Sequence, residues 1–168
     1  MFQSEIYGLW DTIQYDNGYD TDYHDVWTLS ANTELARTSE GTTFTAVGTG
    51  ANYIALNDGV NDANQVFLDS TQDFRLEFST QVSNQIGMYF GTASNRNQLN
   101  LGYHNLNLNR WVVDVLNSQG KVYVYLNNAV NPNYTYNVDF GGALISFRIV
   151  DWQGDCNILL KDFKAYYI

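Results

Sequence analysis

Apolar and polar residues alternate along several short stretches of the chain, which is the pattern of β-strands with one buried face. In the clearest stretch, KVYVYLNN, Val122 and Val124 point to one side together with Leu126. Tyr123 and Tyr125 point to the other side. A sheet needs one apolar face for its core, but it does not need phenol rings on the opposite face. These two tyrosines are therefore the first candidates for a role outside the core.

The same alternation predicts further strands, most clearly in the second half of the chain. The elements expected there are FRLEFST (74–80), QIGMYFGT (85–92), a hairpin over 110–128 that turns at NSQG, and a second hairpin over 143–168 that turns at DWQGDC. In the first half, the expected strands are an edge strand at 5–15 and shorter strands at 25–30, 34–38, 42–48 and 51–57. The side chains expected to point away from the core include Arg75, Glu77, Tyr89, Asp114 and Arg148.

No long window repeats apolar residues every three to four positions, so helices are not expected. Stacking two sheets with their apolar faces together hides the aliphatic residues of both, which a single sheet cannot do. The sequence therefore predicts an all-β fold, a two-sheet antiparallel β-sandwich of ten to twelve strands. The 168 residues are close to the size of one ordinary domain, and we interpret 1–168 as a single domain.

The charge balance narrows the class of partner. With 8 Lys+Arg against 18 Asp+Glu, the formal net charge is −10. A nucleic-acid binder needs a basic surface to neutralise phosphates, and an anionic membrane attracts basic segments, so neither partner is expected. Neutral or cationic partners, such as uncharged sugars, remain. The alternative is that the charge serves only to keep the protein soluble.

The cysteine content and the absence of targeting signals argue against several classes of site and segment. Cys156 is the only cysteine, so neither an internal disulfide nor a CxxC metal site is expected. The stretch MFQSEIYGLW lacks the basic region and apolar run of a signal peptide. No run approaches 18 apolar residues, so no membrane span is expected.

Three segments, 74–92, 110–128 and 145–168, together resemble the concanavalin A-like lectin/glucanase jelly roll, particularly its laminin-G-like modules. The resemblance rests on the order of the strands, on the V-x-V-Y-x-N hairpin strand and on the closing strand with LKDFKAY. It covers residues 70–168 well and residues 1–69 poorly. Similar modules occur in the tail and appendage proteins of viruses and in surface adhesins.

The resemblance implies a concave outer sheet face on which aromatic rings stack against sugars while polar groups bond the hydroxyls. The candidate ligand-binding residues are Tyr89, Tyr103, Tyr123, Tyr125, Arg75, Glu77, Asp114 and Arg148. Two other interpretations stay open. The rings could lie in an interface between subunits, or they could simply fill the sheet, because tyrosine favours strands and cross-strand aromatic pairs are stabilising.

Calcium is the only cofactor that the sequence suggests. The loop YDNGYDTDYHD (15–25) is rich in the oxygen ligands that calcium prefers, but its spacing does not fit an EF-hand. A solvated acidic loop is the favoured interpretation. The resemblance implies a structural calcium held by Asp162 near the N-terminal strand, where Glu5 or Asp11 could be its partner.

A catalytic role finds little support. The carboxylate motifs of the glucanase members, Glu-x-Asp-x-x-Glu and Glu-x-Asp-x-Glu, are absent. Glu77 and Asp114 could lie on neighbouring strands, and a retaining hydrolase places two carboxylates about 5 Å apart. We interpret them as two strand carboxylates that share a face by chance. His24 and His104 are too isolated to indicate a metal triad.

These observations together predict a non-enzymatic binding module for glycans or another cell-surface ligand, in a virion tail or an extracellular surface appendage. The first alternative is a structural assembly domain that buries the tyrosine face between copies of the chain or between neighbouring subunits. The second alternative is a glycoside hydrolase.

Overall fold

The structure is a computed structural model that describes residues 28–30, 33–38, 41–46, 52–56, 71–82, 86–92, 95, 98–104, 109–141, 145–151 and 157–168. In these ranges the chain forms twelve strands and one short 3-10 turn, Asn117–Gln119. Among the same residues, none belongs to a helix of the length and apolarity that a membrane span requires.

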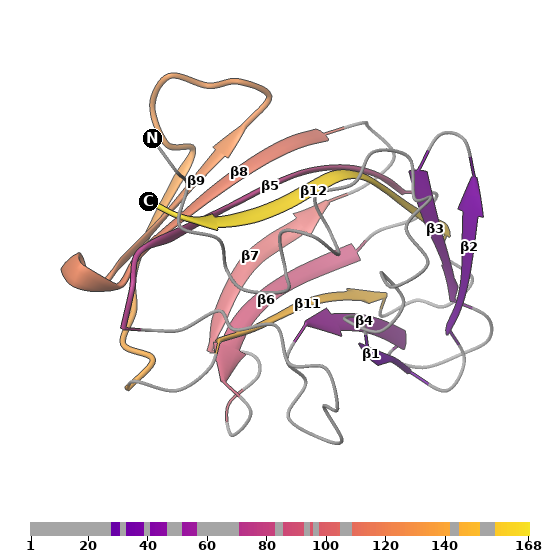
Figure 1. Cartoon of the computed structure of the whole chain (residues 1–168), viewed down its shortest axis with the longest axis horizontal. Helices are drawn as coiled ribbons and strands as arrows, with labels where there is room; N and C mark the ends of the chain where they lie inside the picture. The colour runs from indigo at the N-terminus through magenta and orange to yellow at the C-terminus, as the bar shows by residue number, and fades with distance from the viewer. Residues whose placement is uncertain are drawn as a thin grey trace.

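The strands form two antiparallel sheets, drawn as two layers in Figure 1. The five-stranded sheet has the order β1-β4-β11-β6-β7, with bounds Thr28–Leu29 (β1), Asn52–Leu56 (β4), Ile145–Asp151 (β11), Ile86–Thr92 (β6) and Leu99–His104 (β7). The seven-stranded sheet has the order β10-β9-β8-β5-β12-β3-β2, with bounds Tyr134–Asn137 (β10), Lys121–Leu126 (β9), Asn109–Leu116 (β8), Phe74–Val82 (β5), Asn157–Tyr167 (β12), Gly41–Ala46 (β3) and Thr33–Thr38 (β2).

A series of aromatic rings joins the two sheets through the core. Trp111 of β8 stacks on Phe78 of β5, with ring centroids 6.0 Å apart. Phe78 contacts Phe147 of β11 across the gap between the sheets, at 5.5 Å between centroids. Phe147 in turn contacts Phe90 of β6 at 5.0 Å. All four side chains are fully buried, so their burial and ring contacts stabilise the packing of one sheet on the other.

The structure confirms the predicted fold class and most of the predicted strands. The hairpin over 110–128 is present as β8 and β9, and its turn ends at Gly120 in the left-handed conformation, with φ of 61°. The strands expected at 74–80 and 85–92 are β5 and β6, and β1 to β4 overlap the four shorter strands expected in the first half. The edge strand expected at 5–15 lies outside the described residues.

The second predicted hairpin, over 143–168, is wrong. Its first strand, β11, pairs with β4 and β6 in the five-stranded sheet. Its second strand, β12, pairs with β3 and β5 in the other sheet. The chain therefore crosses between sheets where a hairpin was expected. Two further strands, β7 and β10, were not predicted, because LNLGYH and YTYN contain the asparagine and glycine that are depleted in strands.

We predict that Thr80→Val lowers the free energy of unfolding by about 1–3 kcal/mol, the usual cost of removing a partner from a buried polar group. The buried Trp111 indole N–H donates to Thr80 Oγ1 at 2.9 Å, and valine keeps the shape of threonine without the acceptor. Urea denaturation should show a lower midpoint with an unchanged slope. The control, Thr80→Ser, keeps the hydroxyl and should lose clearly less stability than Thr80→Val. Equal losses in the two variants would contradict the assignment.

Candidate functional site

One outward face of the seven-stranded sheet gathers most of the candidate residues. Antiparallel partners lie on the same face, and the register places Arg75 opposite Asp114 and Asp114 opposite Tyr123. In the next row, Glu77 lies opposite Val112, which lies opposite Tyr125. We call this surface the polar–aromatic face and define it by the outward residues of β5, β8 and β9 that the following paragraphs describe: Arg75, Glu77, Arg110, Asp114, Tyr123 and Tyr125.

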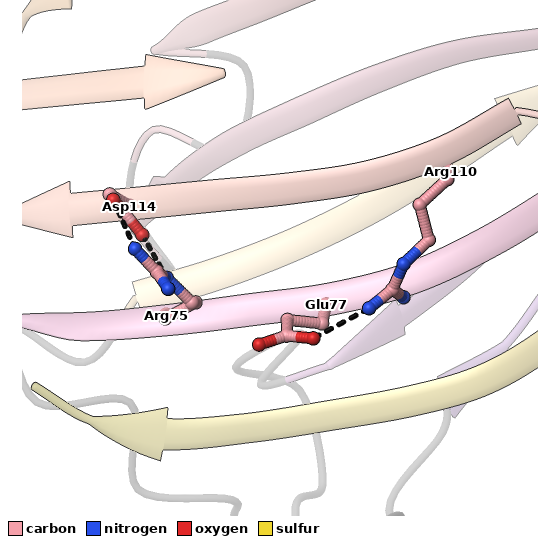
Figure 2. Close-up of polar contacts among 4 residues, drawn as sticks. All are labelled: Arg75, Glu77, Arg110 and Asp114. Atoms are coloured by element: carbon pink, nitrogen blue, oxygen red, sulfur yellow. Dashed lines mark hydrogen bonds and ion pairs between the residues drawn. The ribbon is translucent and has the colours of Figure 1, made fainter. Parts of the chain in front are cut away.

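A two-pronged ion pair occupies the middle of the face. Arg75 Nε donates to Asp114 Oδ1 at 2.5 Å, and Arg75 Nη2 donates to Asp114 Oδ2 at 2.8 Å (Figure 2). The Asp114 side chain is only 9% exposed, whereas that of Arg75 is 35% exposed. Two parallel hydrogen bonds fix both groups in position. The carboxylate is therefore covered and compensated, while part of the guanidinium still meets solvent.

A second ion pair lies diagonally across the same two strands. Arg110 Nη2 of β8 donates to Glu77 Oε2 of β5 at 2.5 Å (Figure 2). Sequence reasoning did not single out Arg110, although its spacing of four from Asp114 along one strand places both on the same side. The six residues that define the face therefore include two separate ion pairs, Arg75 with Asp114 and Arg110 with Glu77.

The two tyrosines extend the face toward the edge of the sheet. Tyr123 and Tyr125 are both half-buried, and they lie two residues apart on β9. Burial raises the pKa of Tyr125 above its ordinary value, and the negative charge of Asp114 raises this pKa further, while Arg75 opposes the shift. Tyr125 therefore keeps its proton at neutral pH, so it offers both a ring surface and a hydroxyl donor.

Asparagines close one end of the face. The side-chain oxygen of Asn127 accepts from the backbone N–H of Arg110 at 2.9 Å, and the backbone N–H of Asn127 donates to the Arg110 carbonyl at 2.8 Å. Asn127 and Asn128 both have positive φ, 52° and 64°, which asparagine tolerates better than most residues. The Asn127 amide also contacts Asn109 Oδ1 at 3.3 Å. Amide groups are thus held rigidly beside the ion pairs.

Tyr89 and Arg148 do not share this face, although we predicted a single surface. Both lie in the five-stranded sheet, on the neighbouring strands β6 and β11. Tyr89 is only 5% exposed and lies over Gly87, where an added Cβ would come within 2.9 Å of the tyrosine ring. The Arg148 guanidinium lies 4.4 Å from the centre of the Tyr53 ring. Alternation gives the side of a strand that faces away from the core, but it does not give the sheet to which the strand belongs.

Tyr103 belongs to the same five-stranded sheet, where the register pairs it with Gly87. Its side chain lies outside the described part of the structure. The structure therefore brings together five of the eight predicted ligand-binding residues, namely Arg75, Glu77, Asp114, Tyr123 and Tyr125.

The calcium site stays a prediction. Within the described residues, no group of three or more His, Cys, Asp or Glu side chains lies close enough to hold a metal ion. Asp162 falls on β12, in the register shift between Lys161 and Lys164, and its side chain is outside the described residues. The acidic loop 15–25 and the two proposed N-terminal partners, Glu5 and Asp11, are outside them as well.

No protein family and no curated protein matches this sequence. Solved structures match its fold. A family 29 carbohydrate-binding module complexed with mannohexaose is 9% identical, with a TM-score of 0.52, over 93% of this chain and 89% of that one. Lectin I-B4 from Griffonia simplicifolia is 9% identical, with a TM-score of 0.51, over 89% of this chain and 96% of that one.

A sialidase gives a TM-score of 0.58 at 6% identity over 83% of this chain, which spans only 17% of the sialidase. At such low identities the likeness establishes the fold alone. The chain has the jelly-roll β-sandwich architecture that carbohydrate-binding modules and lectins share, as the sequence predicted.

We predict that Asp114→Asn lowers the pKa of Tyr125, because it removes the negative charge that disfavours the phenolate. Tyr136 is the internal control. Burial and then Tyr134 raise the pKa of Tyr136, so it should titrate unchanged in this variant. Titration of ring-labelled tyrosine by NMR through alkaline pH measures both groups in one sample. An unchanged pKa of Tyr125 in the variant would contradict the electrostatic contact.

The raised pKa of Tyr125 also makes the free energy of unfolding depend on pH. The folded-state pKa of Tyr125 lies above the ordinary tyrosine value of about 10, so the folded state favours the neutral phenol. This contribution is fully present below the ordinary pKa and is lost as the pH rises through it toward the folded-state value.

Proposed function

We propose that the chain is a non-enzymatic binding module that recognises a neutral glycan through the polar–aromatic face. The observation that carries the proposal is the placement of Tyr123 and Tyr125 beside ordered hydrogen-bonding groups on an outward sheet face. Half-buried rings present apolar surface to the C–H face of a sugar, while guanidinium, carboxylate and hydroxyl groups bond its hydroxyls. Because ion pairs hold these polar groups in place, little side-chain freedom is lost on binding.

The charge distribution supports a neutral ligand. Each arginine of the face that the structure describes is in contact with a carboxylate, Arg75 with Asp114 and Arg110 with Glu77. An acidic sugar would have to compete with these carboxylates for the guanidinium groups, and it would approach a chain of net charge −10. A neutral sugar meets neither obstacle.

The structural neighbours support the same class of ligand without establishing it. The carbohydrate-binding module was solved with mannohexaose, and the Griffonia simplicifolia protein is named as a lectin. This chain matches almost the full length of both proteins. The tail or surface-appendage setting that the sequence suggests stays part of the proposal, and the single cysteine fits a component made in a reducing compartment.

Hydrolysis is the alternative that the sialidase among the neighbours suggests, and the alginate lyase among them is an enzyme of another reaction class. Against it, Glu77 and Asp114, the carboxylates considered for catalysis, both accept hydrogen bonds from arginine side chains of the sheet. We interpret them as parts of the binding surface. Release of reducing sugar that disappears in Glu77→Gln would support the hydrolase instead.

We predict that Tyr123→Ala and Tyr125→Ala each weaken binding of a neutral oligosaccharide about tenfold, or about 1.4 kcal/mol. This is near the upper end of the range for aromatic contacts, about 0.5–1.5 kcal/mol beyond buried area. Titration calorimetry with mannohexaose, preceded by an array of neutral glycans to find the preferred sugar, measures the loss. Phenylalanine variants, which keep the ring, should retain most of the affinity.

Tyr134→Ala is the matched control, because Tyr134 pairs with the inward Val124 and so lies on the opposite side of the sheet. It should bind the same monovalent oligosaccharide as the unmodified chain does. An alginate oligomer should bind more weakly than the neutral sugar. Absence of binding to any neutral glycan, or equal losses in all three alanine variants, would overturn the proposal.

A further inference from the structure

The strand β10 forms an open edge of the seven-stranded sheet. It pairs with β9 on one side, through the register Tyr134↔Val124 to Asn137↔Lys121, and it has no neighbouring strand on the other side in the described part of the chain. The strand is well exposed, with Tyr134 at 42% and both Thr135 and Asn137 exposed. Among the residues that the structure describes, none pairs with its outer edge.

The hydrogen bonds of β10 show which backbone groups point outward. The Val138 N–H donates to the Gly120 carbonyl at 2.9 Å, so residue 138 bonds toward β9. Successive residues of an antiparallel strand alternate in this respect. Tyr136 therefore also bonds toward β9, whereas the N–H and C=O groups of Thr135 and Asn137 point away from it. Among the described strands, these four groups face no neighbour, because β9 is the only strand that pairs with β10.

This edge carries few of the devices that normally protect an open sheet: β10 is short, and Lys121 of β9 donates from its ammonium to the Asn137 side chain at 2.7 Å, but the residues of the strand itself carry no charge. Proteins place charged residues or proline on edge strands to prevent pairing with other chains. The opposite edge of the same sheet, β2, carries Glu34 and Arg37. The sequence of β10, YTYN, contains neither a charged residue nor a proline, although the chain as a whole is strongly acidic.

We propose that β10 pairs in antiparallel fashion with β10 of a second copy of this chain, about a two-fold axis at Tyr136. Thr135 and Asn137, whose backbone groups point away from β9, lie on either side of Tyr136. The axis therefore sets Thr135 opposite Asn137 of the second copy. The N–H of each residue then meets the C=O of the other, which makes four backbone hydrogen bonds. The pattern is self-complementary, and this favours a second copy over an unrelated strand.

The aromatic residues of the strand strengthen the same pairing. In this register Tyr136 lies opposite its own copy in a non-hydrogen-bonded pair, the type that brings opposing side chains closest. Tyr136 is half-buried against the core, and its ring lies 6.4 Å from that of Tyr134. The two copies would bring four tyrosine rings together at the axis, and aromatic cross-strand pairs are among the stabilising ones.

The small area of the interface and the net charge of each copy determine the affinity of the dimer. A four-residue strand buries less area than a standard stable interface, so the dimer is weak and forms at high protein concentration. Each copy has a net charge of −10, so salt strengthens the association by screening the repulsion. Pairing joins the two seven-stranded sheets and, if the polar–aromatic face binds glycans, sets two such faces on one side.

The test places proline at positions 135 and 137, whose backbone N–H groups point away from β9. Thr135→Pro and Asn137→Pro each remove a donor that points away from β9, so each should spare the fold and weaken the dimer, and at least one of them should abolish it. Thr135→Val keeps the backbone N–H and is the matched control. Sedimentation velocity from micromolar to millimolar concentration, at low and high salt, measures the mass. Circular dichroism and thermal unfolding verify that each variant is folded.

The proposal expects the unmodified chain and Thr135→Val to approach twice the monomer mass at high concentration, more so at high salt, while at least one folded proline variant stays monomeric. Hydrogen exchange should show slower exchange of the Thr135 and Asn137 amides in the dimer. A chain that remains monomeric at every concentration would overturn it. Dimerisation that both proline variants retain would also overturn it, because a different surface would then be responsible.

Discussion

The contact between Phe78 and Phe147 across the core is the constraint from which the rest of the structure follows. It joins β5 of one sheet to β11 of the other, and Trp111 and Phe90 extend it to the next strand of each sheet. Since side chains alternate along a strand, an inward Phe78 requires that Glu77 point outward. The neighbour of Trp111, Arg110, is turned outward in the same way.

The ion pairs of the outer face are therefore a consequence of core packing. The register that sets Phe78 opposite Trp111 also sets Arg75 opposite Asp114. A shift of one residue would expose both rings and bury the charges, at a cost far above the energy of any surface contact. The core thus fixes the geometry of the polar–aromatic face, and a ligand meets groups whose positions are already set.

Sequence alone could predict which side chains of a strand point away from the core, but not which strands lie beside it. Alternation placed Arg75, Glu77, Asp114 and the two β9 tyrosines outward, and all five lie together on one face. It also placed Tyr89 outward, but on the other sheet, because period-two patterning carries no information about the sheet to which a strand belongs.

The same limit explains the wrong hairpin at 143–168. Two alternating strands with a polar turn satisfy the pattern of a hairpin, whether they pair with each other or cross between sheets. Pairing between distant segments, such as β5 with β12, is decided by how the whole core closes. Arg110 was missed for a different reason: its partner Glu77 is 33 residues away, and only the register brings the two together.

Two surfaces of the seven-stranded sheet, the polar–aromatic face and the β10 edge, differ in the charged groups that they carry. On the polar–aromatic face, the carboxylates and guanidinium groups form two ion pairs, so a polar, uncharged ligand meets hydrogen-bonding groups whose charges are compensated. At the β10 edge, the residues of the strand itself carry no charge, and the Lys121 ammonium that reaches the Asn137 side chain comes from β9.

In a chain of net charge −10, both arrangements leave local regions where like-charge repulsion is weakest. A neutral sugar and a second copy of β10 can each approach such a region, since neither requires a free counter-charge there. The long-range repulsion between whole copies remains, and it acts on self-association far more than on sugar binding. Salt should therefore separate the two events, strengthening the dimer while leaving the affinity for a neutral oligosaccharide almost unchanged.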